Sequence, residues 1–187
     1  MEILTSQQRK KLDETDDSQF YSIPKFVYHL DANFRRNLTE LYKKEMFNNC
    51  SVLDLMSSWD SYLPKNITYR TVIGHGLNKE ELDRNKILEK YWVQNFNINQ
   101  NIPLENNSID YCLMVAAWQY LQYPEKISEE ISRILKHKGK FIISFSNRAF
   151  WHKSPNIWTY SSEEERLQYV RNILIANGFL EPRIIRN

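Results

Sequence analysis

Two histidines have the side-chain chemistry and the sequence surroundings of a reactive site. His75 lies between Gly74 and Gly76, and these small neighbours predict that its imidazole is exposed at the end of a strand. His29 follows the aromatic-containing segment from residue 21 to 28. Because an imidazole titrates near neutral pH, either residue could take a proton from a bound molecule. The competing interpretations are a surface histidine in a glycine turn for His75 and packing of the amino-terminal helix on the sheet for His29.

A second group of polar side chains follows the apolar run from residue 141 to 145. Asn147 and Arg148 lie at this position. The guanidinium of an arginine is a planar fork of donors that suits an anionic or carbonyl group, so both residues are candidates for contact with a substrate. An arginine in a solvated loop is the alternative interpretation.

Several other chemistries lack the motifs that they require. The four histidines are scattered along the chain, and neither Cys50 nor Cys112 has a paired cysteine, so the sequence predicts no metal site. The sequence has no G-x-S-x-G elbow of the serine hydrolases. It also lacks G-x-G-x-x-G after a strand and the phosphate-binding G-x-x-x-x-G-K, which argues against nicotinamide cofactors and nucleoside triphosphates.

Short apolar runs alternate with amphipathic stretches, and this alternation predicts the elements that must position these residues. Strands are expected over residues 51–55, 69–74, 91–96, 110–116, 141–145 and 179–185. Helices are expected to begin at Asp31, near residue 78, at Pro124 and at Ser162, and Gly139 is expected to end the third of them. The order predicts an α/β fold with a Rossmann-like, doubly wound, mostly parallel sheet. Ligands of such sheets bind beyond the carboxyl ends of the strands, where the strand order reverses.

The composition fits one soluble domain without a nucleic-acid or membrane partner. The chain has 187 residues, 42% of them apolar, and its formal net charge of +2 predicts no broad basic face. No apolar run approaches the roughly 20 residues that span a bilayer. Residues 1–17 lack the apolar core of a signal peptide, and two unpaired cysteines suit a reducing compartment, so the cytoplasm or an organelle stroma is expected. The charged first twenty residues are expected to be frayed or loosely helical, and residues 31–187 to form a single domain.

The stretch from Ile102 to Asn147 carries a series of spaced features, IPLENNSIDYCLMVAAWQYLQYPEKISEEISRILKHKGKFIISFSN. The features are Pro103 with Leu104, Asp110 before an apolar strand, Tyr120 with Leu121, Pro124, and Leu135 with Gly139. In these features the chain resembles the class I S-adenosylmethionine-dependent methyltransferases, in particular the methyltransferase type 11 group.

Two shorter motifs extend this resemblance. VLDLMSSW, from Val52 to Trp59, is similar to the first motif of the family, and VIGHGLN, from Val72 to Asn78, is similar to its second strand. DLMSSW and GHGLN also resemble a narrower group of short methyltransferase-like proteins from photosynthetic lineages. The resemblance covers roughly residues 38 to 185.

The resemblance implies a methyltransferase that takes S-adenosyl-L-methionine as its cofactor and acts on a small acceptor or on an exposed group of a partner. The residues implied to bind the cofactor are Asp54, Met56, Ser57, Ser58, His75, Gly76, Leu77, Asn95, Phe96 and Ala116. Residues implied to bind the substrate are Tyr21, Tyr28, Trp118, Asn147 and Arg148, and Tyr120 is expected to pack instead. His29 and His75 are the catalytic candidates if the acceptor must lose a proton, and residues 1–30 are expected to cover the cofactor site.

The sequence departs from the family pattern at two places that matter for the cofactor. Met56 to Trp59 fill the loop that is rich in glycine in the family, and Gly76 stands where the family has an acid that accepts ribose hydroxyls. These departures favour an alternative, a catalytically inactive methyltransferase fold with a binding or regulatory role. A weaker alternative is another nucleotide binder of the Rossmann type. The family sheet also ends in an antiparallel pair, of which only residues 179–185 remain here, so an open sheet edge could pair with a second copy as a homodimer.

Overall fold

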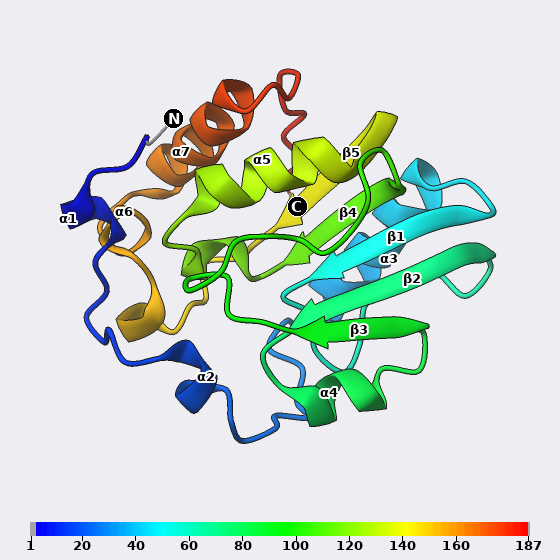
Figure 1. The fold of residues 1–187 in the computed structure, drawn as a ribbon, viewed down its shortest axis with the longest axis horizontal. Helices are drawn as coiled ribbons and strands as arrows, with labels where there is room; N and C mark the ends of the chain where they lie inside the picture. The colour runs from blue at the N-terminus through cyan, green and yellow to red at the C-terminus, as the bar shows by residue number, and fades with distance from the viewer. Residues whose placement is uncertain (1–2, 187) are drawn as a thin grey trace.

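The computed structural model describes residues 3–186, and its centre is a five-stranded parallel sheet (Figure 1). The strands are β1 (Cys50–Leu55), β2 (Tyr69–Gly76), β3 (Lys90–Val93), β4 (Ile109–Val115) and β5 (Leu135–Ser144). They are ordered β3-β2-β1-β4-β5, and every neighbouring pair is parallel. The chain therefore winds outward from β1 in one direction and from β4 in the other, which is the doubly wound arrangement predicted from the sequence.

Helices cover both faces of this sheet. The longer helices are α3 (Ala32–Glu45), α5 (Pro124–Ile134) and α7 (Glu163–Ala176), and the short ones are α1 (Ser6–Arg9), α2 (Asp17–Phe20), α4 (Lys79–Arg84) and α6 (Asn156–Thr159), with single 3-10 turns η1 (Trp118–Tyr120) and η2 (Trp151–Lys153). In Figure 1, α5 and α7 lie in front of the sheet and α3 lies behind it.

The two faces of the sheet form two apolar clusters because successive side chains of a strand point to opposite sides. Leu53 packs with the fully buried Ile127 and Ile131 of α5, whereas Val52 packs with Leu38 and Tyr42 of α3. Ile127 and Ile131 thus belong to the buried face of α5, which packs on this side of the sheet.

The predicted helix starts are also confirmed by their caps. The Asp31 carboxylate accepts the backbone N–H of Phe34 at 2.9 Å. Ser162 and Glu165 form the reciprocal capping box at the start of α7. Such caps satisfy N–H groups that have no partner inside the helix.

Two predictions about the second half of the chain are wrong. Residues 179–186 form no strand, so the sheet of the described residues has no antiparallel member. Phe179 instead packs its ring against Phe141 of β5 at 5.9 Å. Gly139 does not end α5, which stops at Ile134; it lies inside β5 next to an irregularity in the pairing with β4. A side chain there would come within 2.9 Å of the Lys136 carbonyl oxygen, which explains the glycine.

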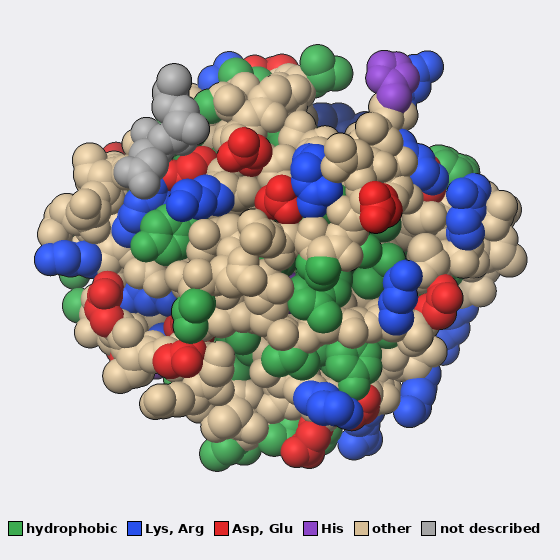
Figure 2. All heavy atoms as spheres, in the orientation of Figure 1, with side chains coloured by type: hydrophobic (Ala, Val, Ile, Leu, Met, Phe, Trp, Pro, Cys, Tyr) green, Lys and Arg blue, Asp and Glu red, His purple; other side chains and the backbone are tan. Residues whose placement is uncertain are grey.

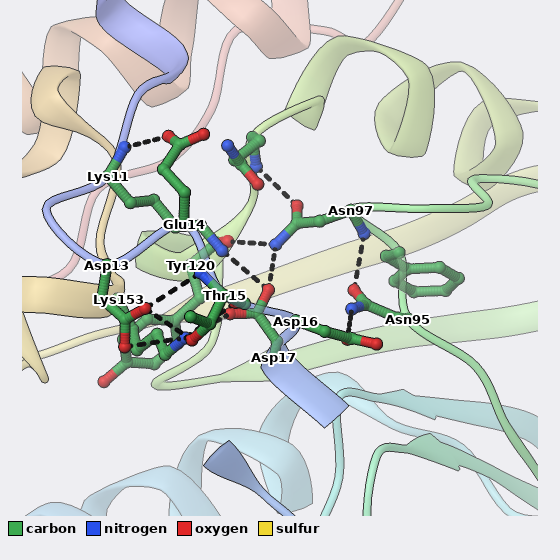
Figure 3. A network of polar contacts seen from close by, with 12 residues as sticks. Lys11, Asp13, Glu14, Thr15, Asp16, Asp17, Asn95, Asn97, Tyr120 and Lys153 are labelled. Atoms are coloured by element: carbon green, nitrogen blue, oxygen red, sulfur yellow. Dashed lines mark hydrogen bonds and ion pairs between the residues drawn. The ribbon is translucent and has the colours of Figure 1, made fainter. Parts of the chain in front are cut away.

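Residues 3–30, here called the N-terminal segment, run past the carboxyl ends of the strands (Figure 1). Ion pairs of the buried Lys11 and Lys153 hold this segment, so it is not frayed, and α1 and α2 are the short helices within it. Lys11 contacts Asp17 at 2.7 Å, and Lys153 of η2 contacts Asp13 at 3.0 Å and donates to the Thr15 carbonyl oxygen at 2.9 Å (Figure 3). The segment is therefore fixed to a loop that lies more than a hundred residues away in the sequence.

Charges of both signs are intermixed on the face of the molecule shown in Figure 2. Within residues 3–186, no helix is long and apolar enough to cross a lipid bilayer.

Candidate functional site

A cavity of about 430 Å³ lies at the carboxyl ends of the strands, beneath the N-terminal segment. Its wall includes the ends of β1, β2 and β4 and the loops that follow β3 and β5. The strand order reverses between β1 and β4, so the cavity lies where sheets of this type bind their ligands. Its volume is within the range of roughly 300–1,000 Å³ that is usual for small-molecule sites.

The loop after β1 bends through a residue in the left-handed backbone region. Met56 has φ 54°, a conformation that favours glycine, and it lines the cavity. Asp54 is almost fully buried and accepts a hydrogen bond from the Ser57 hydroxyl at 2.5 Å. Burial raises the pKa of Asp54 to about 6, and Asp60 adds to that rise. The loop after β1 therefore makes a left-handed turn at Met56, although it has none of the glycines that the family has there.

His75 is buried, so the prediction from its glycine neighbours that it is exposed is wrong. Its Nδ1 accepts the backbone N–H of Met56 at 3.1 Å, and its Nε2 faces the Gln94 carbonyl oxygen at 2.9 Å, which requires the proton on Nε2. The ring stacks on Phe96 with 3.8 Å between centroids, and burial lowers the pKa of His75 to about 3. Since both nitrogens have partners and the ring stays neutral, His75 shapes the cavity wall and is poorly suited to accept a proton.

Gly76 has no room for the acid that its position implies. A Cβ there would lie 2.6 Å from the Ser57 carbonyl oxygen, so the loop after β1 occupies that space. A carboxylate reaches the same part of the cavity from α4 instead. Glu81 lines the cavity, accepts the backbone N–H of Lys25 at 2.7 Å and accepts the Ser58 hydroxyl.

The other residues implied to bind the cofactor also line the cavity. They are Ser57, Ser58, Leu77, Asn95, Phe96 and Ala116. Ala116 has φ 49°, so the ends of both β1 and β4 turn through non-glycine residues in the left-handed region. The side-chain amide of Asn95 donates to Asp16 at 2.9 Å and so joins the loop after β3 to the N-terminal segment.

The N-terminal segment contributes aromatic side chains to the cavity. Tyr21, Tyr28 and His29 line it, and Tyr28 packs on Trp59 with 4.5 Å between centroids. Trp59 itself does not line the cavity. His29 contacts Phe150 edge to face at 5.7 Å, and partial burial lowers its pKa, so its imidazole is largely neutral at pH 7.

Two residues predicted to bind the substrate lie elsewhere. Trp118 is fully buried in the core, 6.2 Å from Phe141, and Asn147 is exposed outside the cavity wall. Arg148 does line the cavity. Tyr120, which was expected to pack, lines it as well. The 3-10 turn η1 explains this exchange because it rotates Trp118 toward α7 and the next two residues toward the cavity.

Several cavity residues were not singled out from the sequence. They are Asp17, Lys25, Glu81 and Phe150, whereas Asp60 and Gln119, which also line the cavity, lie in the loops after β1 and β4 where the sequence places the site. Gln119 could have been ranked higher because it follows a strand, but nothing in the local pattern marks Asp17 or Lys25. Among residues 3–186, no group of three or more histidine, cysteine or acidic side chains is placed to hold a metal ion.

The strand order and the position of the cavity define the class I methyltransferase fold. Residues 60–143 match a family model described as a methyltransferase domain, in agreement with the resemblance seen in the sequence. No curated protein sequence matches the chain.

Solved structures show the same fold at low sequence identity. A methyltransferase from Aquifex aeolicus, described as S-adenosylmethionine-dependent, is 20% identical with a TM-score of 0.55, over 80% of this chain and 88% of that one. Phosphoethanolamine N-methyltransferase 2 from Haemonchus contortus, in complex with S-adenosyl-L-methionine, is 17% identical with a TM-score of 0.59, over 80% of this chain and 37% of that one.

A third solved structure matches this chain over only part of its own length. A chain of the Haloferax volcanii complex that contains the Trm112 methyltransferase activator is 22% identical with a TM-score of 0.50. The match covers 59% of this chain and 52% of that one, so the chain spans about half the length of this relative.

Proposed function

We propose that the protein is an S-adenosyl-L-methionine-dependent methyltransferase that acts on a small acceptor. The observation that carries this proposal is the cavity at the reversal of the strand order, which stays open although methionine and serine replace glycine in its wall. The fold neighbours and the match of residues 60–143 to a methyltransferase domain support the same activity.

The cavity wall fits a ligand that carries positive charge. Its side chains include four carboxylates and two cationic groups, at Asp17, Asp54, Asp60, Glu81, Lys25 and Arg148. Aromatic rings from the N-terminal segment and from Phe96 and Phe150 complete the wall. Carboxylates and aromatic faces both attract cations such as a sulfonium.

The residues of the chain would act mainly by positioning. The bound donor supplies an electrophilic methyl group, and holding an acceptor in line with it can provide most of the rate. Glu81 would accept ribose hydroxyls in place of the missing acid at Gly76, and the loop from Met56 to Ser58 would hold the methionine part. His29, being neutral and on the cavity wall, is the better candidate than His75 for taking a proton from the acceptor.

Binding of S-adenosylhomocysteine tests this proposal. A ligand at a hundredfold excess over its dissociation constant stabilises the folded state by about 2.7 kcal/mol. For a domain of this size that corresponds to a rise in melting temperature of about 5–10 °C. Glu81→Gln should weaken binding about tenfold because it removes a charge-assisted hydrogen bond. Glu80→Gln, on the exposed side of α4, is the matched control and should bind like the wild type.

The alternative function is a catalytically inactive methyltransferase fold with a binding role. The non-glycine loop and Gly76 favour it. Absence of any shift with S-adenosylhomocysteine would support this alternative, and a shift with a nicotinamide cofactor instead would favour another nucleotide binder.

We also propose that the protein is located in the cytoplasm or an organelle stroma. We further propose that it forms a homodimer through the edge of β5. β5 is the last strand of the sheet, and an unpaired strand edge can pair with another chain. Light scattering should then give a mass that rises from monomer to dimer with concentration. A monomer mass at every concentration would contradict the dimer.

A further inference from the structure

Two buried acceptors on the cavity wall have no hydrogen-bond donor among the described residues. Oδ1 of Asp17 and Oε1 of Gln119 are both shielded from solvent and unpartnered. The two residues are only 6% and 1% exposed, and both line the cavity. Leaving such acceptors without a donor destabilises a protein, so an occupant of the cavity is expected to supply one.

The surroundings of Asp17 leave this oxygen free for an occupant. Its other oxygen accepts from Lys11 at 2.7 Å and from the Asn97 amide at 2.8 Å (Figure 3). The Lys153 ammonium lies 3.7 Å from Oδ1, beyond hydrogen-bond distance. Lys153 directs its own hydrogen bonds to the Thr15 carbonyl and hydroxyl oxygens instead.

Tyrosines complete this part of the cavity. Gln119 interacts with the Tyr120 hydroxyl through its side chain. Burial raises the pKa of Tyr21, and the nearby charges of Asp17 and Glu81 raise it further. The wall here combines unpartnered acceptors with aromatic rings, and this combination suits a ligand that bears hydrogen-bond donors rather than an anion.

We infer that the methyl acceptor carries an amino group, bound through Asp17 and Gln119 beside the rings of Tyr21 and Tyr120. This inference rests on the proposed function. Gln119 and Tyr120 follow β4, and Asp17 is bound by Asn97 after β3, whereas the Tyr21 carbonyl accepts from Asn78 after β2, so the group extends across the cavity from β4 toward β2. The bound ammonium group first loses a proton to His29, which passes it to solvent. The nitrogen lone pair then forms the carbon–nitrogen bond while the methyl–sulfur bond breaks and its electron pair stays on sulfur.

Matched ligands test the inference by calorimetry with S-adenosylhomocysteine present and absent. The probes are 2-phenylethylamine, 2-phenylethanol and phenylacetate, with n-butylamine and n-butanol as an aliphatic pair. At least one amine should bind, and its alcohol and the carboxylate should bind at least about tenfold more weakly, as expected for the loss of a hydrogen bond between charged groups. Binding of neither amine, or stronger binding of the carboxylate, would overturn the inference and would leave water as the donor.

Substitutions distinguish residues that bind the methyl acceptor from residues that bind the cofactor. Asp17→Asn and Gln119→Met should each weaken amine binding about tenfold and leave the affinity for S-adenosylhomocysteine unchanged. Asp13→Asn alters the same ion-pair network outside the cavity and should change neither affinity. If either cavity variant loses S-adenosylhomocysteine binding while folded, the two acceptors serve the cofactor and the inference is wrong. Failure of the wild type to bind S-adenosylhomocysteine at all would instead refute the proposed function.

Discussion

At the scale of single residues, the site keeps a backbone course that glycine would adopt more easily. Met56 and Ala116 both have left-handed φ values, at the ends of the two central strands. An L-residue in this region is strained by roughly 1–2 kcal/mol. Tyr62 has a left-handed φ as well, and all three residues line the cavity, where loop shape determines what can bind. The remaining left-handed residues, Asn49, Asn107 and Lys138, lie away from the cavity.

Ala116→Gly should therefore stabilise the protein by up to about 1 kcal/mol, since it relieves strain and removes only one methyl group. Ala117→Gly is the matched control, because Ala117 is buried with φ −130° and should lose about 1 kcal/mol or more through backbone entropy and lost packing. Urea unfolding of both variants gives the two free energies. Equal destabilisation at the two positions would show that the left-handed turn carries no strain.

At the scale of elements, the sequence predicted the strands and helices that position the site better than the N-terminal segment that lies over it. β1, β2 and β4 follow from apolar runs, α5 follows from Pro124 and the period of its apolar residues, and α7 follows from its capping box, since these are local signals. The fixed structure of the N-terminal segment could not be predicted from local signals, because it depends on pairs such as Lys11–Asp17 and on Lys153, which is distant in sequence. His75 was misjudged for the same reason: its burial comes from the rings of Trp92 and Phe96, which belong to β3 and the following loop.

Lys153→Met should loosen the N-terminal segment. The buried Lys153 ammonium donates to the Thr15 carbonyl and hydroxyl oxygens, and the loss of such charge-assisted hydrogen bonds typically costs about 1.5–3 kcal/mol. Limited trypsin digestion should then cut after residues 9–11 and 25 under conditions in which the wild type is intact. Lys44→Met, at an exposed position on α3, is the control and should leave the digestion pattern unchanged.

At the scale of the whole molecule, two buried groups act in opposite directions on the pH dependence of stability. His75 stays neutral when folded, with a pKa of about 3, but in the unfolded chain it takes up a proton near 6.5. Its contribution is complete above pH 6.5 and is lost as the pH falls toward 3. Asp54, with a pKa of about 6 against 3.8, keeps a proton in the folded state, so it partly offsets this loss below pH 6.

Urea unfolding at pH 7, 5.5 and 4.5 tests this balance. The His75→Gln variant should lose stability less steeply than the wild type on acidification, by up to about 1.4 kcal/mol per pH unit. Asp54→Asn should lose it more steeply, because the offset is gone. Parallel curves for the three proteins would contradict both assignments.

The contact between Lys153 and Thr15 also sets an order of events during synthesis and folding. The two residues are 138 positions apart, so closing this loop must wait until the loop after β5 exists and the sheet is in place. Before that moment the nascent chain can hold a nearly complete sheet whose pocket is still uncovered and open to solvent. Competence to retain a small molecule would then arise last, after most of the secondary structure has formed.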